Sequence, residues 1–138
     1  MIGGMPEIAR TRVGLRIFGD ALDPDEITRL LGIAPTGCAH KGDTHRTASG
    51  REVVAQSGSW RLDADLSGNL NTQIGALLTK LPGDPTIWRA LTEHYECDVF
   101  CGLFMRDGNE GVELSPEVMS MLGVRGLRLG LDIYSEAE

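Results

Sequence analysis

The chain has 138 residues, of which 41% are hydrophobic and 24% charged, values that are typical of one soluble globular domain. No apolar run reaches the roughly 18 residues of a transmembrane helix, and the N-terminus lacks the basic and apolar regions of a signal peptide, so we expect a cytoplasmic protein. The net charge of −7 disfavours binding to nucleic acid or to a membrane. It either maintains solubility or suits a basic partner surface.

The first predicted elements are a strand and a short helix. Residues 1–9 are expected to form a flexible leader, and the polar–apolar alternation of Arg10–Gly19 predicts a strand with one buried face. The helix is predicted to begin after Asp23, which forms a capping box with Glu26. Gly32 is expected to end it in a left-handed conformation.

Residues 34–52 are polar, rich in glycine and without hydrophobic periodicity, which predicts a long loop that is either functional or mobile. Its His40, Lys41 and Asp43 bring together groups that bind an anion or relay protons. Trp60, on the following strand, is expected to form a wall beside them. The alternative interpretation is a surface loop in which Lys41 and Asp43 only shape a turn.

The rest of the chain alternates between helical and strand-like patterns. Aspartate or serine precedes a proline at two of the predicted helix starts, as is typical of an N-cap followed by the first helical residue. In chain order we predict a strand over Val53–Asp63 that is interrupted near Ser57-Gly58, helices over Asn69–Leu81 and Asp84–Tyr95, a strand over Asp98–Met105, a helix over Ser115–Gly123 and a strand over Leu127–Tyr134.

An internal repeat suggests how these elements are organised. Leu22–Ala34 recurs in looser and shorter form as Leu114–Val124, with a cap, a proline and a glycine stop in each copy. We predict a single α+β domain over 10–134, with an acidic tail at 135–138. Its single-layer, mostly antiparallel sheet has helices on one face, in a ferredoxin-like arrangement of pseudo-duplicated β-α-β units with a helical pair inserted between them.

The three cysteines, Cys38, Cys97 and Cys101, are an odd set without a secretion signal, which favours reduced thiols. His94, Cys97 and Cys101 resemble a metal-ligand pattern. On a strand, however, the two cysteines lie roughly 13 Å apart, too far to share one zinc ion. We therefore expect no metal and no cofactor, and we interpret the thiols as part of the core.

Two further chemical interpretations are weaker. Cys101 and a distant histidine would form a nucleophilic pair, but a thiol in an apolar strand is usually inert. Asp132 lies next to Leu131 and Ile133 in the last predicted strand and faces the opposite side. If the outer face of the sheet is open, we expect Asp132, Trp60 and Arg16 to line a groove there.

Several segments, in this order, resemble a bacterial family of unknown function, the one numbered 4279. They are Gly19-Asp20, Leu22–Thr28, Leu31-Gly32, Lys41–Asp43, Gly58–Trp60 and Leu129–Tyr134. The resemblance covers nearly the whole chain and implies a small standalone bacterial protein, with no established activity and no catalytic residues to transfer. The positions of this resemblance that we would test first are Lys41, Gly42, Asp43, Trp60, Asp132 and Tyr134.

The small size, the acidic charge and the lack of a coherent catalytic set favour a non-enzymatic binding or interaction module. Such a module would be a neutralising or regulatory partner of another protein. The alternative is a small-molecule-binding protein or an enzyme, whose candidate ligand-binding residues are His40, Lys41, Asp43, Trp60, Asp132 and Tyr134. Homodimerisation through an edge or a face of the sheet is compatible with either function.

Overall fold

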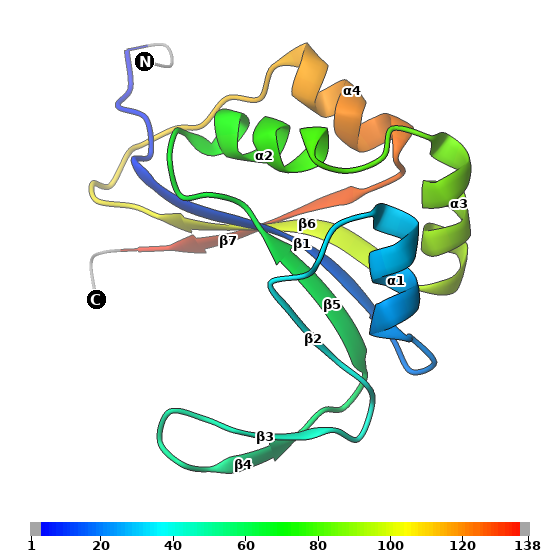
Figure 1. Cartoon of the computed structure of the whole chain (residues 1–138). Helices are drawn as coiled ribbons and strands as arrows, with labels where there is room; N and C mark the ends of the chain where they lie inside the picture. Colours follow the sequence, from blue (N-terminus) through cyan, green and yellow to red (C-terminus); the bar gives the residue numbers. More distant parts are fainter. Residues whose placement is uncertain (1–3, 136–138) are drawn as a thin grey trace.

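A computed structural model of the chain describes residues 4–135 and shows a sheet with helices on one face and a two-stranded ribbon on the other (Figure 1). The helices are α1 (Pro24–Leu31), α2 (Leu70–Thr79), α3 (Pro85–His94) and α4 (Pro116–Val124). The strands are β1 (Arg10–Gly19), β2 (Gly37–Ala39), β3 (Thr44–Arg46), β4 (Glu52–Val54), β5 (Gly58–Asp63), β6 (Glu96–Phe104) and β7 (Arg128–Tyr134).

The main sheet has the strand order β2-β5-β1-β6-β7. The central strand β1 is antiparallel to both of its neighbours, β2 is antiparallel to β5, and only β7 runs parallel to the strand beside it. The α+β class and the mostly antiparallel sheet with helices on one face are therefore confirmed (Figure 1).

The ferredoxin-like duplication is not confirmed. The first predicted β-α-β unit pairs β1 with β5 antiparallel, whereas the second pairs β6 with β7 parallel through the crossover helix α4. The two helices share a capped start, at Asp23 and Ser115. They end differently, because α4 continues through the predicted stop Gly123, and Gly126 adopts the left-handed conformation at φ 67° instead.

Two local predictions in the N-terminal half are corrected. Residues 34–52 are not a continuous loop, since β2 and β3 lie inside this segment and β4 starts at its end. Each of these strands has three residues and little burial, so it leaves no hydrophobic periodicity. At α1 the Asp23 side chain accepts from the amide of Asp25 rather than from that of Glu26, so the capping box does not form.

The core lies between the helices and the sheet, and two fully buried tryptophans anchor it. Trp60 of β5 donates from its indole nitrogen to the Thr28 hydroxyl of α1 at 3.1 Å. Trp88 of α3 donates to the Pro82 carbonyl at 2.7 Å. The large side chains of the core thus gather on the helix-covered face, which leaves the other face of the sheet free for polar and aromatic residues.

The start of the chain is fixed to the domain over residues 6–8. The Ile8 amide donates to the Gly111 carbonyl, and the Gly111 amide donates to the Pro6 carbonyl, each at 3.0 Å. Residues 1–3 of the predicted leader and residues 136–138 of the predicted tail lie outside the described residues. Across 4–135, none of the helices has the length and apolarity needed to cross a membrane.

Candidate functional site

The face of the sheet opposite the helices carries an unusual set of side chains. In β1 the inward positions are Val13, Leu15 and Ile17, so the alternate positions face outward. Directly opposite residues on neighbouring strands point to the same face. The strand registers therefore define an arginine–aromatic face, made of Arg10, Arg12, Arg16, Phe18, Arg61, Phe100, Phe104, Arg128 and Tyr134.

This face differs in charge from the rest of the protein. Its five arginines share the surface with four carboxylates, those of Asp63, Glu96, Asp98 and Asp132, which leaves a net charge of +1. Since the whole chain has a net charge of −7, the remainder carries −8. The face also holds all three phenylalanines of the chain. The face is therefore less acidic than the remainder of the chain taken together, and it is rich in aromatic residues.

Arg16 is at the centre of this face. Its guanidinium makes two hydrogen bonds to the carboxylate of Asp98, at 2.9 and 2.8 Å, and lies 4.0 Å from the ring centroid of Phe100. The hydrogen bond from Arg16 to Asp98 raises the pKa of the guanidinium. Two fixed bonds and a ring contact hold this side chain in one orientation, as a preorganised recognition group requires.

A second arginine faces Arg16 across the strand pair β1–β5. Arg61 is its direct partner in the register, and the Arg61 guanidinium donates to Asp63 at 3.1 Å. Like charges directly opposite each other on neighbouring strands reduce the stability of the fold by about 0.2–1 kcal/mol. The carboxylates of Asp98 and Asp63 offset this cost on opposite sides of the arginine pair. An additional anion between the two guanidiniums would be stabilised by both.

The aromatic part of the face lies toward β7. The Arg10 guanidinium is 4.4 Å from the ring centroid of Phe104, and that ring stacks on Tyr134 at 4.7 Å with an interplanar angle of 8°. The Tyr134 hydroxyl donates to Asp132, and this hydrogen bond raises the pKa of the phenol. The stacked pair and its arginine form a flat apolar shelf with polar groups at its rim.

A cavity of about 400 Å³ lies between the shelf and the arginine pair. Its residues include Gly14 and Gly102 of the central strands, both buried, whose lack of a side chain leaves room for the side chains of Asp63 and Phe104 beside them. A Cβ atom at Gly14 would lie 2.8 Å from a carboxylate oxygen of Asp63, so a larger residue would displace this partner of Arg61. The other principal residues around the cavity are Arg12, Arg16, Arg61, Leu66, Phe100, Phe104 and Tyr134.

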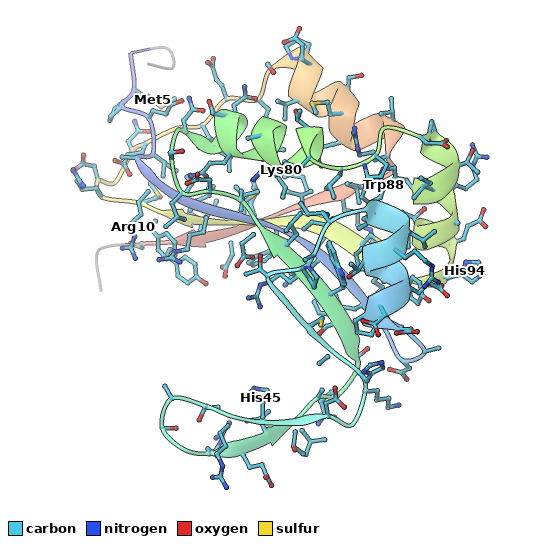
Figure 2. All side chains as sticks on the ribbon, viewed as in Figure 1. Met5, Arg10, His45, Lys80, Trp88 and His94 are labelled. Atoms are coloured by element: carbon cyan, nitrogen blue, oxygen red, sulfur yellow. The ribbon has the colours of Figure 1, made fainter. Side chains whose placement is uncertain are left out.

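A second cavity, of about 620 Å³, lies between the sheet and the ribbon formed by β3 and β4. The ribbon contributes Thr44 and His45 to it, and the sheet contributes Arg16 and Arg61. Figure 1 shows the ribbon on the open side of the sheet, and Figure 2 shows His45 on it, with Arg10 near the opposite end of the sheet. Arg16 and Arg61 line both cavities, and the two cavities together are called the trough below.

The predicted loop residues His40, Lys41 and Asp43 lie together at the base of the ribbon. Lys41 donates to Asp20 at 3.0 Å, and this bond lowers the pKa of the Asp20 carboxyl. Asp43 accepts from the His40 amide at 2.9 Å, and the His40 ring lies 3.6 Å from Asp23. These exposed contacts hold the ribbon against the corner between β1 and α1. Of the three residues, Asp43 also lines the trough.

The other predicted site residues lie elsewhere. Asp132 and Tyr134 are on β7, at the opposite edge of the sheet from β2, a separation of four strand spacings or roughly 19 Å. Trp60 is fully buried and hydrogen-bonds to α1 on the helix side. Its ring therefore packs in the core, although Trp60 is also among the residues that line the cavity under the ribbon. Its role as a wall beside a ligand stays a prediction. Arg16 and Asp132 do lie on the same open face of the sheet, and a groove that both of them line stays a prediction.

The thiols of Cys97 and Cys101 are also on the helix side and are buried. Burial raises their pKa values to about 11 and about 12, so both are protonated at neutral pH. Cys38 is exposed. Within 4–135, no three histidine, cysteine or acidic side chains lie close enough together to hold a metal ion.

These environments predict selective alkylation of the native protein. We expect Cys38 to react readily at pH 8, and Cys97 and Cys101 to react only after unfolding. Burial blocks access to the two thiols, and a pKa rise of two units alone lowers the thiolate fraction about 100-fold. Mass spectrometry of intact protein treated with iodoacetamide measures this. Rapid modification of three thiols in folded protein would contradict the described burial, and the urea-unfolded protein is the control.

Of the residues on this face, only Arg16, Asp132 and Tyr134 were predicted from the sequence as candidates for a site. The remaining arginines, Arg10, Arg12, Arg61 and Arg128, and the phenylalanines were not. One signal was present: the outward positions of Arg10–Gly19 hold three arginines and no acid, in a chain with seven more acidic than basic residues. Such a bias in a strand of an acidic protein indicates a surface with a charge-specific role.

The fold and the face together define a small α+β domain with one helix-covered and one open, arginine-bearing sheet surface. The chain belongs to the family described as a domain of unknown function, DUF4279, which matches residues 9–136. The resemblance inferred from the sequence segments is thereby confirmed. Searches among curated proteins and among solved structures gave no match.

Proposed function

We propose that this protein is a non-enzymatic binding module that holds an acidic segment of a partner protein in the trough across its arginine–aromatic face. The observation that carries the proposal is the opposite charge of this face, +1 against −8 for the remainder of the chain. An acidic segment is attracted to the face and repelled elsewhere, which fixes where it docks.

The chemistry of the trough fits a peptide better than a polynucleotide. Its arginines offer planar groups that bind carboxylates in a bidentate manner, and its stacked rings accept flat or aliphatic side chains. Asp63 and Asp98 remain beside Arg61 and Arg16, and would repel a continuous phosphate backbone. A segment that alternates acidic and apolar residues matches both features.

The shape of the trough supports an extended ligand. The two cavities share Arg16 and Arg61 in their linings, and residues of the ribbon line only one of them. An extended chain can therefore enter along the open cavity and pass under β3. Free thiols at Cys97 and Cys101 are consistent with a cytoplasmic protein, which we include in the proposal. A neutralising or regulatory role toward the partner follows from occupancy of its acidic segment.

Affinity capture from the native host tests this proposal. The double variant Arg16→Gln/Arg61→Gln removes two guanidiniums and leaves the core unchanged. We expect this variant to bind the captured polypeptide at least about 100-fold more weakly, because each charge-assisted hydrogen bond contributes about 1.5–3 kcal/mol. The captured complex should also dissociate as ionic strength rises, because the contacts are between charges.

A matched control is Arg29→Gln/Arg89→Gln, which removes two exposed arginines of α1 and α3 on the other side of the molecule. We expect it to bind as the unchanged protein does. Equal capture by the two double variants would refute the proposed site. Recovery of no specific polypeptide by the unchanged protein would count against a protein partner altogether.

The cavity under the ribbon favours a second candidate, a small anionic ligand held by His45, Arg16 and Arg61. Its volume of about 620 Å³ is within the usual range for small-molecule sites. Mass spectrometry of protein purified from its native host under non-denaturing conditions distinguishes the two. A bound small molecule that is lost in the Arg16→Gln/Arg61→Gln variant would replace the peptide proposal with this one.

A further inference from the structure

The two edges of the main sheet differ in how they are protected. At one edge, β2 has three residues and continues into the segment that leads to the ribbon. At the other edge, β7 has seven residues, with no proline and no lysine among them. Within 4–135, no strand pairs with its outer side. A long edge strand without these protective features is a template for another strand.

The exposed side chains of β7 support this interpretation. Leu131 and Ile133 point to the helix side of the sheet, as their partners Cys101 and Leu103 do, but they remain 47% and 57% exposed. They lie one strand beyond the fully covered part of the core. A further strand beside β7 would extend the sheet and shield both side chains from water.

Backbone groups of β7 define how such a strand can pair. The Tyr134 carbonyl accepts from Met105, next to β6, at 3.0 Å. Because hydrogen-bonding groups alternate in direction along a strand, those of Leu129, Leu131 and Ile133 point to the unpaired side. In an antiparallel pair of two copies, Leu129 and Leu131 of one chain would then exchange hydrogen bonds with Leu131 and Leu129 of the other.

This register is complementary in charge. It places Gly130 opposite its own copy at the two-fold axis, where the lack of side chains permits the close approach of a pair without hydrogen bonds. Arg128 then lies opposite Asp132 of the second chain, and Asp132 opposite Arg128, on the open face of the sheet. One strand thus supplies both members of two reciprocal ion pairs.

We infer that the β7 edge binds a second copy of this chain in an antiparallel two-fold pair centred on Gly130. The occupant is a copy of the chain itself because β7 is self-complementary in three respects: its hydrogen-bonding groups, its apolar residues and its charges. The resulting ten-stranded sheet brings two arginine–aromatic faces together on one side, with the two troughs related by the two-fold axis. This inference rests on β7 and not on the proposed partner.

Sedimentation velocity of the full chain tests the inference over concentrations up to about 1 mM. We expect the unchanged protein to form a dimer. Arg128→Asp and Asp132→Arg should each weaken it at least about tenfold, since the symmetry makes each substitution act twice. The combined variant Arg128→Asp/Asp132→Arg restores opposite charges across the pair and should restore the dimer. Arg89→Asp, on the exposed side of α3, is the matched control and should dimerise normally.

Two further readouts keep the test decisive if a charge reversal disturbs the fold. Leu131→Lys puts a charge on an already exposed side chain and should give a folded monomer, judged by its circular dichroism. Amide exchange of Leu129 and Leu131 should slow as the protein concentration rises, because only the dimer protects these groups. A monomer at all concentrations overturns the inference, and so does a dimer whose affinity the β7 substitutions leave unchanged.

Discussion

Replacement of Trp60 by alanine is expected to reduce the free energy of unfolding by about 3–5 kcal/mol, the usual cost of removing a large buried aromatic side chain. The indole is fully buried on the helix side of β5, and it donates to Thr28 of α1 at 3.1 Å. The substitution leaves a cavity under α1, whose two turns depend on packing. A domain of this kind has about 5–15 kcal/mol of stability in total, so much of it would be lost.

Urea denaturation followed by far-ultraviolet circular dichroism measures this change without relying on the deleted fluorophore. Tyr134→Ala is the control, because it removes another aromatic side chain that is 46% exposed on the open face. We expect the control to lose about 1 kcal/mol or less. A Trp60→Ala loss as small as that of the control would show that the indole does not anchor α1 to the sheet.

The second large effect concerns Gln73, a polar side chain of α2 that is almost fully buried. Its amide nitrogen donates to the carbonyls of Thr11 and Leu66, at 3.3 and 3.0 Å, and its oxygen accepts from the Thr11 hydroxyl at 2.6 Å. Gln73→Leu removes all three bonds. We expect the free energy of unfolding to fall by about 2–5 kcal/mol, because each buried polar group left without a hydrogen-bond partner costs about 1–3 kcal/mol.

A double-mutant cycle separates this effect from a simple change of volume. Thr11→Val removes the hydroxyl that Gln73→Leu would leave unpaired. The combined variant should therefore lose less stability than the sum of the two single variants in urea denaturation. Additive losses would mean that the hydroxyl and the amide do not act as a pair.

The sequence predicted those elements whose signal is local. The alternation in Arg10–Gly19 matched β1 at both ends, and the caps at Asp23 and Asp84 preceded α1 and α3 as expected. Glycine was a less reliable guide: Gly32 ends α1, but Gly123 lies inside α4 and Gly126 takes the left-handed position. A helix end depends on packing as well as on the residue type.

The candidate face could not be predicted from the sequence, because it depends on which residues of neighbouring strands lie opposite each other. Arg16 and Asp98 are 82 positions apart, and only the register of β1 with β6 places them opposite each other. The sheet order likewise separates the ribbon from β7, so the residues first proposed as one site lie at two edges. Trp60 illustrates a related difficulty, because an aromatic residue in a half-buried strand has the same pattern whether it faces the core or a ligand.

Site-specific photo-crosslinking in the native host tests most directly whether the open face is the binding surface. A photoreactive phenylalanine analogue replaces either Phe104 on the arginine–aromatic face or Met119, an exposed residue of α4 in the helix layer. We predict a covalent adduct with a partner polypeptide from position 104 and none from position 119, with the crosslinked segment rich in aspartate and glutamate. Adducts from position 119 alone, or from neither position, would contradict the proposal that the open face is the binding surface.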